Sequence, residues 1–188
     1  MGYGNPSSSY AGFMPEFLPI PIPGSARARL LEAGIARFQE LGYERASVVD
    51  IARDAGVTTG SLYHHFKNKM GLYVVIRDEM ETRMTERMEG ASSAVGGAGR
   101  PAIQAGLEVA FDAAVRFGVT RILAEPRPDE TPDAIAGALS ELLPLPARPA
   151  GAMLAAAWRA ALLAVAGGAS PAAAKAGMDW VLSTESAA

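Results

Sequence analysis

The sequence predicts an all-α protein, and three observations lead to that prediction. Hydrophobic residues make up 49% of the 188 residues, and alanine supplies much of this share, which favours helices over strands. Apolar residues recur at helical spacing in several segments, and clusters of glycine and proline separate those segments. The aromatic and β-branched residues form no strand-rich segment. We therefore expect a three-helix head at the N-terminus, followed by a larger helical body.

Residues 1–24 precede the first predicted helix. They contain five prolines and no Lys or Arg, so they lack the basic start and the unbroken apolar stretch of a secretory signal. We interpret this segment as a mobile extension. Its apolar side chains, among them Tyr10, Phe13 and Phe17, leave open the alternative that it packs onto the body or onto a partner.

The first helix is predicted over residues 25–41, where apolar residues form one stripe at helical spacing. Gly42 is expected to end this helix as a residue that tolerates positive φ. The stripe consists of Leu31, Ile35 and Phe38, with Leu30, Gly34 and Leu41 beside it. This helix would brace the two helices that follow it.

A helix-turn-helix motif is predicted directly after the first helix. Ala52, Gly56 and Leu62 stand where two short helices meeting at a steep angle need a small side chain, a residue free to take positive φ, and an apolar plug. Ser47 and Thr58 are expected to cap the two helices by accepting backbone N–H hydrogen bonds. The expected core of the head consists of Leu31, Ile35, Phe38, Val48, Ile51, Ala52, Val57, Leu62 and Phe66. The alternative is a helical hairpin buried in a larger core, but the second helix carries small polar residues where a core would need apolar ones.

The body is predicted to begin with a long helix over residues 69–89, which would bridge head and body. Its buried side is expected to consist of Leu72, Ile76, Met80, Met84 and Met88. Exposed ion pairs, such as Arg77 with Glu81, are expected elsewhere on this helix. The Gly- and Ser-rich segment that follows breaks the helix, and residues 102–124 are helical in pattern with a break near Gly118.

Three shorter helices are predicted in the rest of the chain, over residues 131–143, 151–166 and 171–183, with proline- and glycine-rich loops between them. The apolar run 150–169 is rich in alanine and is interrupted by Arg159. We therefore do not expect it to span a membrane.

Charge is unevenly distributed along the chain. The net charge is −3, yet residues 25–69 hold seven Lys or Arg and five Asp or Glu, which gives +2 and leaves −5 for the remainder. A modestly basic head on an acidic body lets DNA meet the head and not the body, because attraction to phosphates is local at physiological salt.

The second helix of a helix-turn-helix pair places its N-terminal turn in the major groove of DNA. That turn holds Thr58, Thr59, Gly60 and Ser61. The hydroxyls of Thr59 and Ser61 can hydrogen-bond with base edges, and Gly60 permits a close approach because it has no side chain. We expect these four residues to read the DNA sequence.

This region resembles the N-terminal DNA-binding domain of the tetracycline-repressor (TetR) family of bacterial transcriptional regulators. The resemblance rests on Gly42, Tyr43, Ser47, Ala55, Gly56, Val57, Gly60, Leu62, Tyr63, His65, Phe66 and Lys69. Met70 departs from the family pattern, in which an acidic residue is usual at this position and would favour a helix N-terminus. We therefore expect a weaker start to the fourth helix, with no loss of fold.

The resemblance implies that Ser47, Tyr63, His64 and Lys69 contact DNA phosphates. From its position, Arg27 is a further candidate for contact with the DNA backbone or the minor groove, as is the neighbouring Arg29. The ring of Tyr63 has an alternative role as a core aromatic, and His65 is expected to pack at the end of the recognition helix. Neighbouring histidines on a helix point about 100° apart, so His64 and His65 are not expected to bind a metal.

A head of this size touches few base pairs, so we expect a homodimer whose two heads are about 34–36 Å apart on double-stranded DNA. The candidate dimer interface consists of Met153, Leu154, Ala157, Ala161, Leu162, Val165, Met178 and Val181. The alternative is that these residues only close the core of the monomer. The family resemblance implies that the two chains form a four-helix bundle here.

The resemblance also implies that the body, residues 70–188, binds a small molecule that changes the spacing of the two heads. The candidate effector-binding residues are Met84, Met88, Leu107, Phe111, Phe117, Ile122 and Trp158. For each of them the alternative is an ordinary core position. Nothing in the sequence of the body identifies the class of effector.

Other classes of protein are disfavoured. The sequence has no HExxH motif, no Gly-rich phosphate loop and no cysteine, and its two histidines both lie in the head, so we expect neither an enzyme nor a cofactor. An architectural DNA-binding protein without an effector is the main alternative, and a protein that uses the motif to bind another protein is a third. We expect a cytoplasmic regulator, most simply a repressor, with DNA, a second copy of itself and an unknown small molecule as partners.

Overall fold

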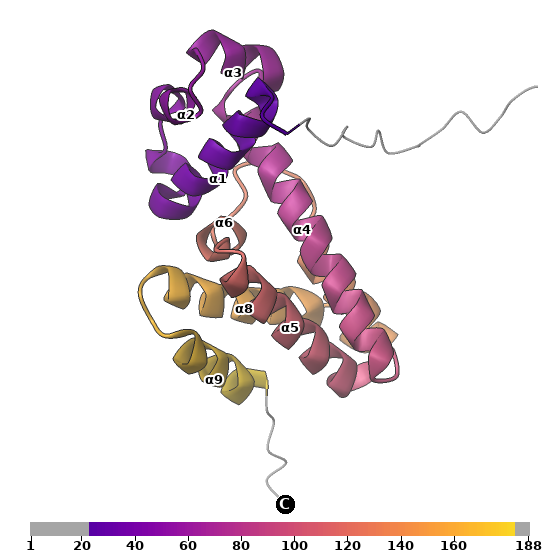
Figure 1. The fold of residues 1–188 in the computed structure, drawn as a ribbon. Coiled ribbons are helices and arrows are strands. Elements are labelled where there is room, and N and C mark those ends of the chain that lie inside the picture. Colours follow the sequence, from indigo (N-terminus) through magenta and orange to yellow (C-terminus); the bar gives the residue numbers. More distant parts are fainter. Residues whose placement is uncertain (1–22, 183–188) are drawn as a thin grey trace, which may run out of the picture.

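The computed structural model describes residues 23–182, and the chain in that range is built from helices without strands. Helices α1 to α3 form the head at one end of an elongated molecule, and α4 runs from the head along the body (Figure 1). The predicted all-α class and the head-plus-body arrangement are confirmed. The segment 1–22 and the predicted helix end at Ser183 lie outside the described residues.

The head contains α1 (Ala26–Arg45), α2 (Val48–Asp54) and α3 (Thr59–Phe66). The first helix is capped by Ser25, whose hydroxyl oxygen accepts a hydrogen bond from the Ala28 N–H at 3.2 Å. Gly42 interrupts the helix, as predicted, but its φ of 80° and ψ of 168° are not the left-handed helical values that usually end a helix. They belong to a region that is essentially restricted to glycine, and the chain resumes a helical turn after it.

The buried side of α1 differs from the predicted stripe at two positions, each shifted by one residue. Leu30 and Phe38 are completely buried, whereas the predicted Leu31 and Ile35 are only partly buried. The reason is that Gly34 packs closely against Leu72 and Ile76 of α4, so α1 has α4 on one side and the helix-turn-helix pair on another. The rest of the expected core is present, with Ile51, Ala52, Leu62 and Phe66 buried and Val48 and Val57 partly buried.

Helices α4 (Lys69–Ala94) and α5 (Gly99–Arg116) pack side by side in the body (Figure 1). The predicted apolar side of α4 is buried as expected, but the helix continues five residues beyond the predicted Glu89. Asn68 caps its start, since the side-chain oxygen accepts a hydrogen bond from the Gly71 N–H at 2.7 Å. This cap gives the helix a defined start although Met70 is not acidic.

The remaining elements close the body around α8. They are α6 (Thr120–Ala124), α7 (Ala134–Glu141), the 3-10 turn η1 (Leu145–Ala147), α8 (Ala150–Ala166) and α9 (Pro171–Leu182). Gly118, with a φ of 64°, separates α5 from α6 at the predicted break. Helix α8 packs against α5, α6, α7 and α9. Within residues 23–182, no helix is long and apolar enough to cross a membrane.

The Arg77–Glu81 pair on α4 is buried, which corrects the prediction of an exposed pair. Their Nε and Oε1 atoms lie 2.7 Å apart, and neither side chain is more than 3% exposed. The Arg77 guanidinium also donates to the carbonyl oxygens of Ile122, of Leu123 at 3.0 Å and of Glu125 at 2.9 Å. The i,i+4 spacing predicted the pairing correctly but could not show that the end of α6 covers it.

Further charged groups extend this pair into a cluster that joins α4 to the loop after α6. Arg127 donates to the second carboxylate oxygen of Glu81 at 2.9 Å, to Asp78 at 2.7 Å and to Asp129 at 2.8 Å. The hydrogen bonds from Arg127 hold the pKa of the Asp129 carboxyl well below its ordinary value. The ion pairs of Arg127 with Asp78 and Glu81 therefore fix the loop to the middle of α4.

Replacing Arg77 by Met should lower the free energy of unfolding by about 3–5 kcal/mol, because it removes one of the two close cationic partners of the buried Glu81 carboxylate and leaves the carbonyl oxygens at the end of α6 without their buried donor. Arg83→Met is the matched control, since Arg83 pairs with Glu79 at 2.7 Å on the exposed side of the same helix and should cost at most about 1 kcal/mol. Urea denaturation of the two variants measures the difference. Equal losses would show that burial of the Arg77 pair is incorrect.

Candidate DNA-binding site

The turn between α2 and α3 has the geometry that the sequence predicts. Gly56 has a φ of 64°, and its N–H donates to the Arg53 carbonyl at 3.0 Å. The next N–H, of Val57, donates to the Ala52 carbonyl at 3.0 Å, and together these bonds form a Schellman motif that ends α2. Ala52 is 1% exposed and Leu62 is completely buried, so the small residue and the apolar plug lie inside the head.

Of the two predicted helix caps of the motif, only that of Thr58 is present. The Thr58 hydroxyl accepts a hydrogen bond from the Ser61 N–H at 3.2 Å, as expected. Ser47 occupies the N-cap position of α2, but its side chain makes no capping hydrogen bond, so that prediction is wrong. The helix begins with the hydrogen bond from the Ile51 N–H to the Ser47 carbonyl, and Asp50 in the first turn supplies favourable negative charge.

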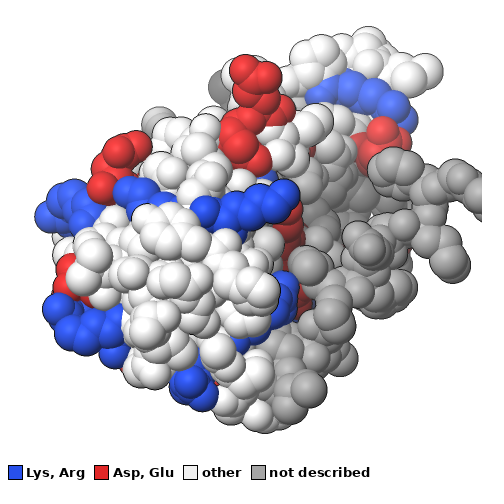
Figure 2. Space-filling view, turned by 90° about the horizontal axis from the view of Figure 1, so that it is seen from above, with Lys and Arg blue, Asp and Glu red and all other residues white. Residues whose placement is uncertain are grey.

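The outer side of α3 presents polar and small residues at the surface. Thr58, Gly60 and His64 are exposed, and Thr59 and Ser61 are partly exposed. Figure 2 looks down on the head and shows Lys and Arg side chains around an uncharged central area. This face combines short hydrogen-bonding side chains with peripheral positive charge, which are the two components of DNA recognition.

Two aromatic side chains of α3 are more accessible than a core role would allow. The ring of Tyr63 is 52% exposed, so the structure does not support the alternative that Tyr63 is a core aromatic. His65, which we expected to pack at the helix end, is also exposed. The side chains that anchor α3 are instead Leu62 and Phe66, which lie on its opposite side.

The predicted basic residues of α1 lie close to the motif. The Arg27 guanidinium is 5.4 Å from the centroid of the Phe66 ring at the end of α3. Arg29 donates from Nε to the Ala55 carbonyl at 2.9 Å, which ties α1 to the turn between α2 and α3. The structure therefore brings Arg27 beside the recognition helix and gives Arg29 a bracing contact.

Lys69 lies at the start of α4, and its ammonium is directed at the C-terminal end of α1. Its Nζ donates to the carbonyl oxygens of Tyr43 at 2.8 Å, Glu44 at 3.2 Å and Ala46 at 3.3 Å. It also lies 4.4 Å from the centroid of the Tyr43 ring. The phosphate contact implied for Lys69 remains a prediction, and this geometry gives the side chain a second role.

Helix α6 joins the head to the body through Gln39, a residue that the sequence analysis missed. The Gln39 side chain donates to the Thr120 hydroxyl at 3.0 Å and accepts from the Arg121 N–H at 2.9 Å. Arg121 in turn donates to the Gln39 carbonyl at 3.1 Å and to the Ala166 carbonyl of α8 at 3.1 Å. No local pattern marks Gln39, because its partners lie about 80 residues away in sequence.

Glu125, at the end of α6, makes the second contact with the head. Its carboxylate accepts a hydrogen bond from the Tyr43 N–H at 3.1 Å and occupies the space where a side chain at residue 42 would be. Its carbonyl accepts from Arg77 of α4. Gly42 is therefore required both by its backbone conformation and by the approach of Glu125.

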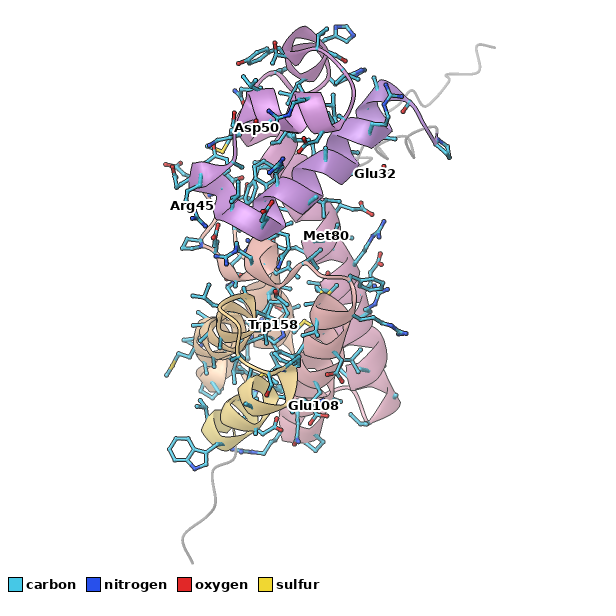
Figure 3. The ribbon with its side chains drawn as sticks, turned by 60° about the vertical axis from the view of Figure 1, so that its left-hand side comes forward. Glu32, Arg45, Asp50, Met80, Glu108 and Trp158 are labelled. Atoms are coloured by element: carbon cyan, nitrogen blue, oxygen red, sulfur yellow. The ribbon has the colours of Figure 1, made fainter. Side chains whose placement is uncertain are left out.

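The predicted effector-binding residues lie inside the body, with one exception. Met84, Met88, Leu107, Phe111, Ile122 and Trp158 are at most 1% exposed, and Trp158 lies in the interior in Figure 3. Phe117 is 50% exposed, so it does not lie in the interior with the other six, and its contact with an effector remains a prediction. It follows the last residue of α5, where the chain turns away at Gly118, and its ring lies 5.1 Å from the Arg87 guanidinium.

The predicted dimer-interface residues fall on two different faces of α8 and α9. Ala161, Leu162 and Met178 are buried within the monomer. For these three residues the structure supports the alternative, in which they close the core of the monomer. Met153 and Val181 are exposed, and Leu154, Ala157 and Val165 are partly exposed. Leu163 and Trp180, which the sequence analysis did not select, are 47% and 79% exposed. Their apolar character was visible in the sequence, but the face of each helix was not.

An exposed recognition helix on a braced three-helix head defines a helix-turn-helix DNA-binding protein. Residues 30–76 match the family model described as bacterial regulatory proteins, tetR family. The chain therefore carries the DNA-binding domain of the tetR family, as the sequence resemblance indicates.

Individual relatives match the chain over segments about as long as this domain. The chain is 42% identical over 60 residues to the HTH-type transcriptional repressor KstR2 of Mycolicibacterium smegmatis, which covers 31% of this chain and 29% of KstR2. It is 37% identical over 62 residues to the A-factor receptor protein of Streptomyces griseus, covering 33% of this chain and 22% of that protein. The matched segment thus spans less than a third of each relative.

The whole fold is similar to solved structures at lower sequence identity. FadR from Bacillus subtilis, solved in complex with stearoyl-CoA, superposes with a TM-score of 0.59 at 16% identity, over 83% of this chain and 97% of FadR. This similarity covers both head and body, and it supports the same fold for the complete described chain.

If Tyr63 makes the predicted phosphate contact, Tyr63→Phe should weaken binding to all DNA sequences alike, by roughly 10- to 100-fold, because it would remove one hydrogen bond to a charged group. The melting temperature should not change, since the ring is half exposed, and neither should the salt dependence, since no charge is lost. Titration of fluorescent duplexes of different sequence measures the effect. A change in base preference would instead place the hydroxyl against a base.

Proposed function

We propose that this protein is a ligand-responsive transcriptional repressor that binds a pseudo-palindromic operator as a homodimer. The observation that carries the proposal is the outward face of α3, which presents Thr58 to Ser61 on a tetR-family head. Relatives matched through the same domain include a transcriptional repressor. The proposal includes a cytoplasmic location, where the protein would meet DNA, and assigns it no catalytic activity.

DNA recognition would use the first turn of α3 in the major groove. Thr59 and Ser61 would contact base edges, and Gly60 would allow the backbone to approach them. Tyr63 and His64, both exposed on the same helix, would contact phosphates. Ser47 would add a phosphate contact through its hydroxyl, which is not used to cap α2.

Dimerisation would use the exposed apolar face of α8 and α9. Met153, Leu163, Trp180 and Val181 are large apolar side chains that are between 47% and 79% exposed. Small residues along both helices, such as Ala157, allow two helices to approach closely. Two helices from each chain would form a four-helix bundle around a twofold axis.

Effector binding would use a pocket of the body. A cavity of ≈ 440 Å³ lies between α4 and α7, and it is lined by Met88, Ser92 and Leu139 among others. Met88 is also one of the predicted effector-binding residues. FadR, which shares the fold, was solved with stearoyl-CoA. The lining here mixes apolar side chains with polar ones such as Glu89 and Glu141, so the pocket favours a ligand that has both apolar and polar groups.

Helix α6 would carry the effector signal to the head. Ile122 of α6 is buried against the body core, while Gln39 and Tyr43 of α1 are hydrogen-bonded to the same short helix. A ligand that prefers one position of α6 by about 1–3 kcal/mol would change operator occupancy by about 5- to 150-fold.

To test this function, the purified protein is used to select DNA duplexes from a random pool. The most strongly enriched duplex is then footprinted with the protein. We expect a protected palindrome with half-sites about 34–36 Å apart that is released by one or more small molecules found in a thermal-shift screen. The architectural alternative would be favoured if the protein coats DNA diffusely and in a salt-sensitive way, without a consensus sequence. In that case none of the small molecules from the screen should release the DNA.

The same experiment tests the dimer. Leu163→Glu should give a monomer with greatly reduced affinity for the palindrome, because it places a charge in the apolar face. Val109→Glu is the matched control, since Val109 is 41% exposed on α5, away from that face. If Leu163→Glu remains dimeric and fully active, the proposed interface is incorrect.

A further inference from the structure

Only two residues join the recognition helix α3 to α4, and the backbone of the first is strained. Within residues 23–182, Lys67 is the only residue other than glycine with a positive φ, which is 66°, and its ψ is −44°. Across it, the Asn68 N–H donates to the Phe66 carbonyl oxygen at 2.8 Å. These features define a γ-turn of the rare kind that has a positive φ. A residue with a side chain keeps such a conformation only where the surrounding structure enforces it.

Gly71 allows the Phe66 carbonyl, which closes this turn, to lie against the first turn of α4. A β-carbon built on Gly71 would overlap the Phe66 carbonyl oxygen. The overlapping atom belongs to the backbone, so the rotation of a side chain cannot relieve the clash. Gly71 lies inside a helix, where glycine is otherwise unfavourable. The observed approach of α3 to α4 therefore requires the absence of a side chain at residue 71.

Asn68 and two buried side chains hold the joint in this geometry. The Asn68 side-chain oxygen accepts a hydrogen bond from the Gly71 N–H at 2.7 Å, and its carbonyl accepts one from the Leu72 N–H at 3.2 Å. Phe66 and Leu72, on the two sides of the joint, are 5% and 0% exposed. Hydrogen bonds and packing thus fix the angle between the two helices at a single value.

This angle affects where the DNA-reading turn of α3 lies. That turn is at the far end of α3 from the joint, whereas α4 continues into the body. A helix of eight residues is about 12 Å long, so a rotation of about 10° at the joint moves the far end by about 2 Å. In a twofold dimer both heads would move, and the two displacements together would approach the rise of one base pair, about 3.4 Å.

We propose that Gly71 is a positioning residue that sets the angle between α3 and α4, and thereby the half-site spacing that the dimer accepts. The consequence for DNA rests on the proposed function. The α6 contacts orient the head as a whole, whereas the joint at residues 67–71 orients the recognition helix relative to α4.

The test on DNA uses duplexes that carry the two half-sites of the operator selected above, with the spacer between them lengthened or shortened one base pair at a time. Gly71→Ala should lose affinity by roughly tenfold at the wild-type spacing, and its optimum should shift by about one base pair. Gly90→Ala is the matched control, because a β-carbon at this glycine of α4 meets no atom within 4 Å. A loss of affinity at every spacing alike, or an unchanged optimum, would overturn the proposal.

Thermal melting of the DNA-free protein tests the geometry of the joint. Gly90→Ala should raise the melting temperature because alanine favours a helix, and Gly71→Ala should lower it because of the clash. Lys67→Gly should melt at a higher temperature than Lys67→Ala, since only glycine takes a positive φ without strain and both variants lose the same charge. Equal melting of the two Lys67 variants, or a rise in Gly71→Ala, would contradict the geometry.

The angle itself can be measured without DNA. Cysteines at His64 of α3 and Glu79 of α4, both exposed, carry two spin labels, and labelled protein is diluted with unlabelled protein so that distances within one chain are recorded. The distance should shift in Gly71→Ala and stay unchanged in Gly90→Ala. An unchanged distance in Gly71→Ala would overturn the proposal even if no operator is found. A shifted distance in a protein that selects no duplex would instead contradict the repressor function and leave the role of Gly71 at the joint in place.

Discussion

The placement of one buried guanidinium underlies the architecture of this protein. Arg77 has its charge paired with Glu81 inside the body, and its remaining donors bind the carbonyls at the end of α6. Helix α6 has only five residues, too few to be stable alone, so these bonds and its packing against α1, α4 and α8 define its position. Because α6 also contacts the head, the orientation of the head depends on a charge that is buried in the body.

The head is consequently attached by contacts of different kinds. Apolar packing of α1 against α4 forms one part of the interface, and Gly34 makes it close. The hydrogen bonds between α6 and the residues Gln39 and Tyr43 also restrict the orientation of the head, because a hydrogen bond depends on its angle as well as on its length. Under the proposed function, such an interface would help a dimer to match its two heads to successive grooves. A ligand in the body would then need to displace α6 only slightly to disturb several directional bonds at once.

The sequence predicted what short-range geometry determines. Ala52, Gly56, Leu62 and Thr58 lie where the structure uses them, because their roles depend on neighbours within ten residues. It failed where the deciding contact is distant. The Arg77 pair was expected at the surface, and Leu31 and Ile35 were expected to be buried on α1 where the structure buries Leu30 and Gly34. In both cases the spacing was correct, but only the fold shows which side of the helix is covered. Phe117 was grouped with residues that the structure buries, although it lies beyond the end of α5. The contacts of Gln39 had no local signal at all.

The most direct test of this account measures whether α6 fixes the heads. The chain has no cysteine, so Glu32→Cys on the exposed side of α1 (Figure 3) carries a single spin label per protomer. Pulsed electron spin resonance then gives the distance between labels in the dimer, with and without Gln39→Ala and Glu125→Ala together. The account predicts a narrow distribution that broadens markedly when both contacts to α6 are removed. An unchanged width, or the absence of any intersubunit distance, would contradict it.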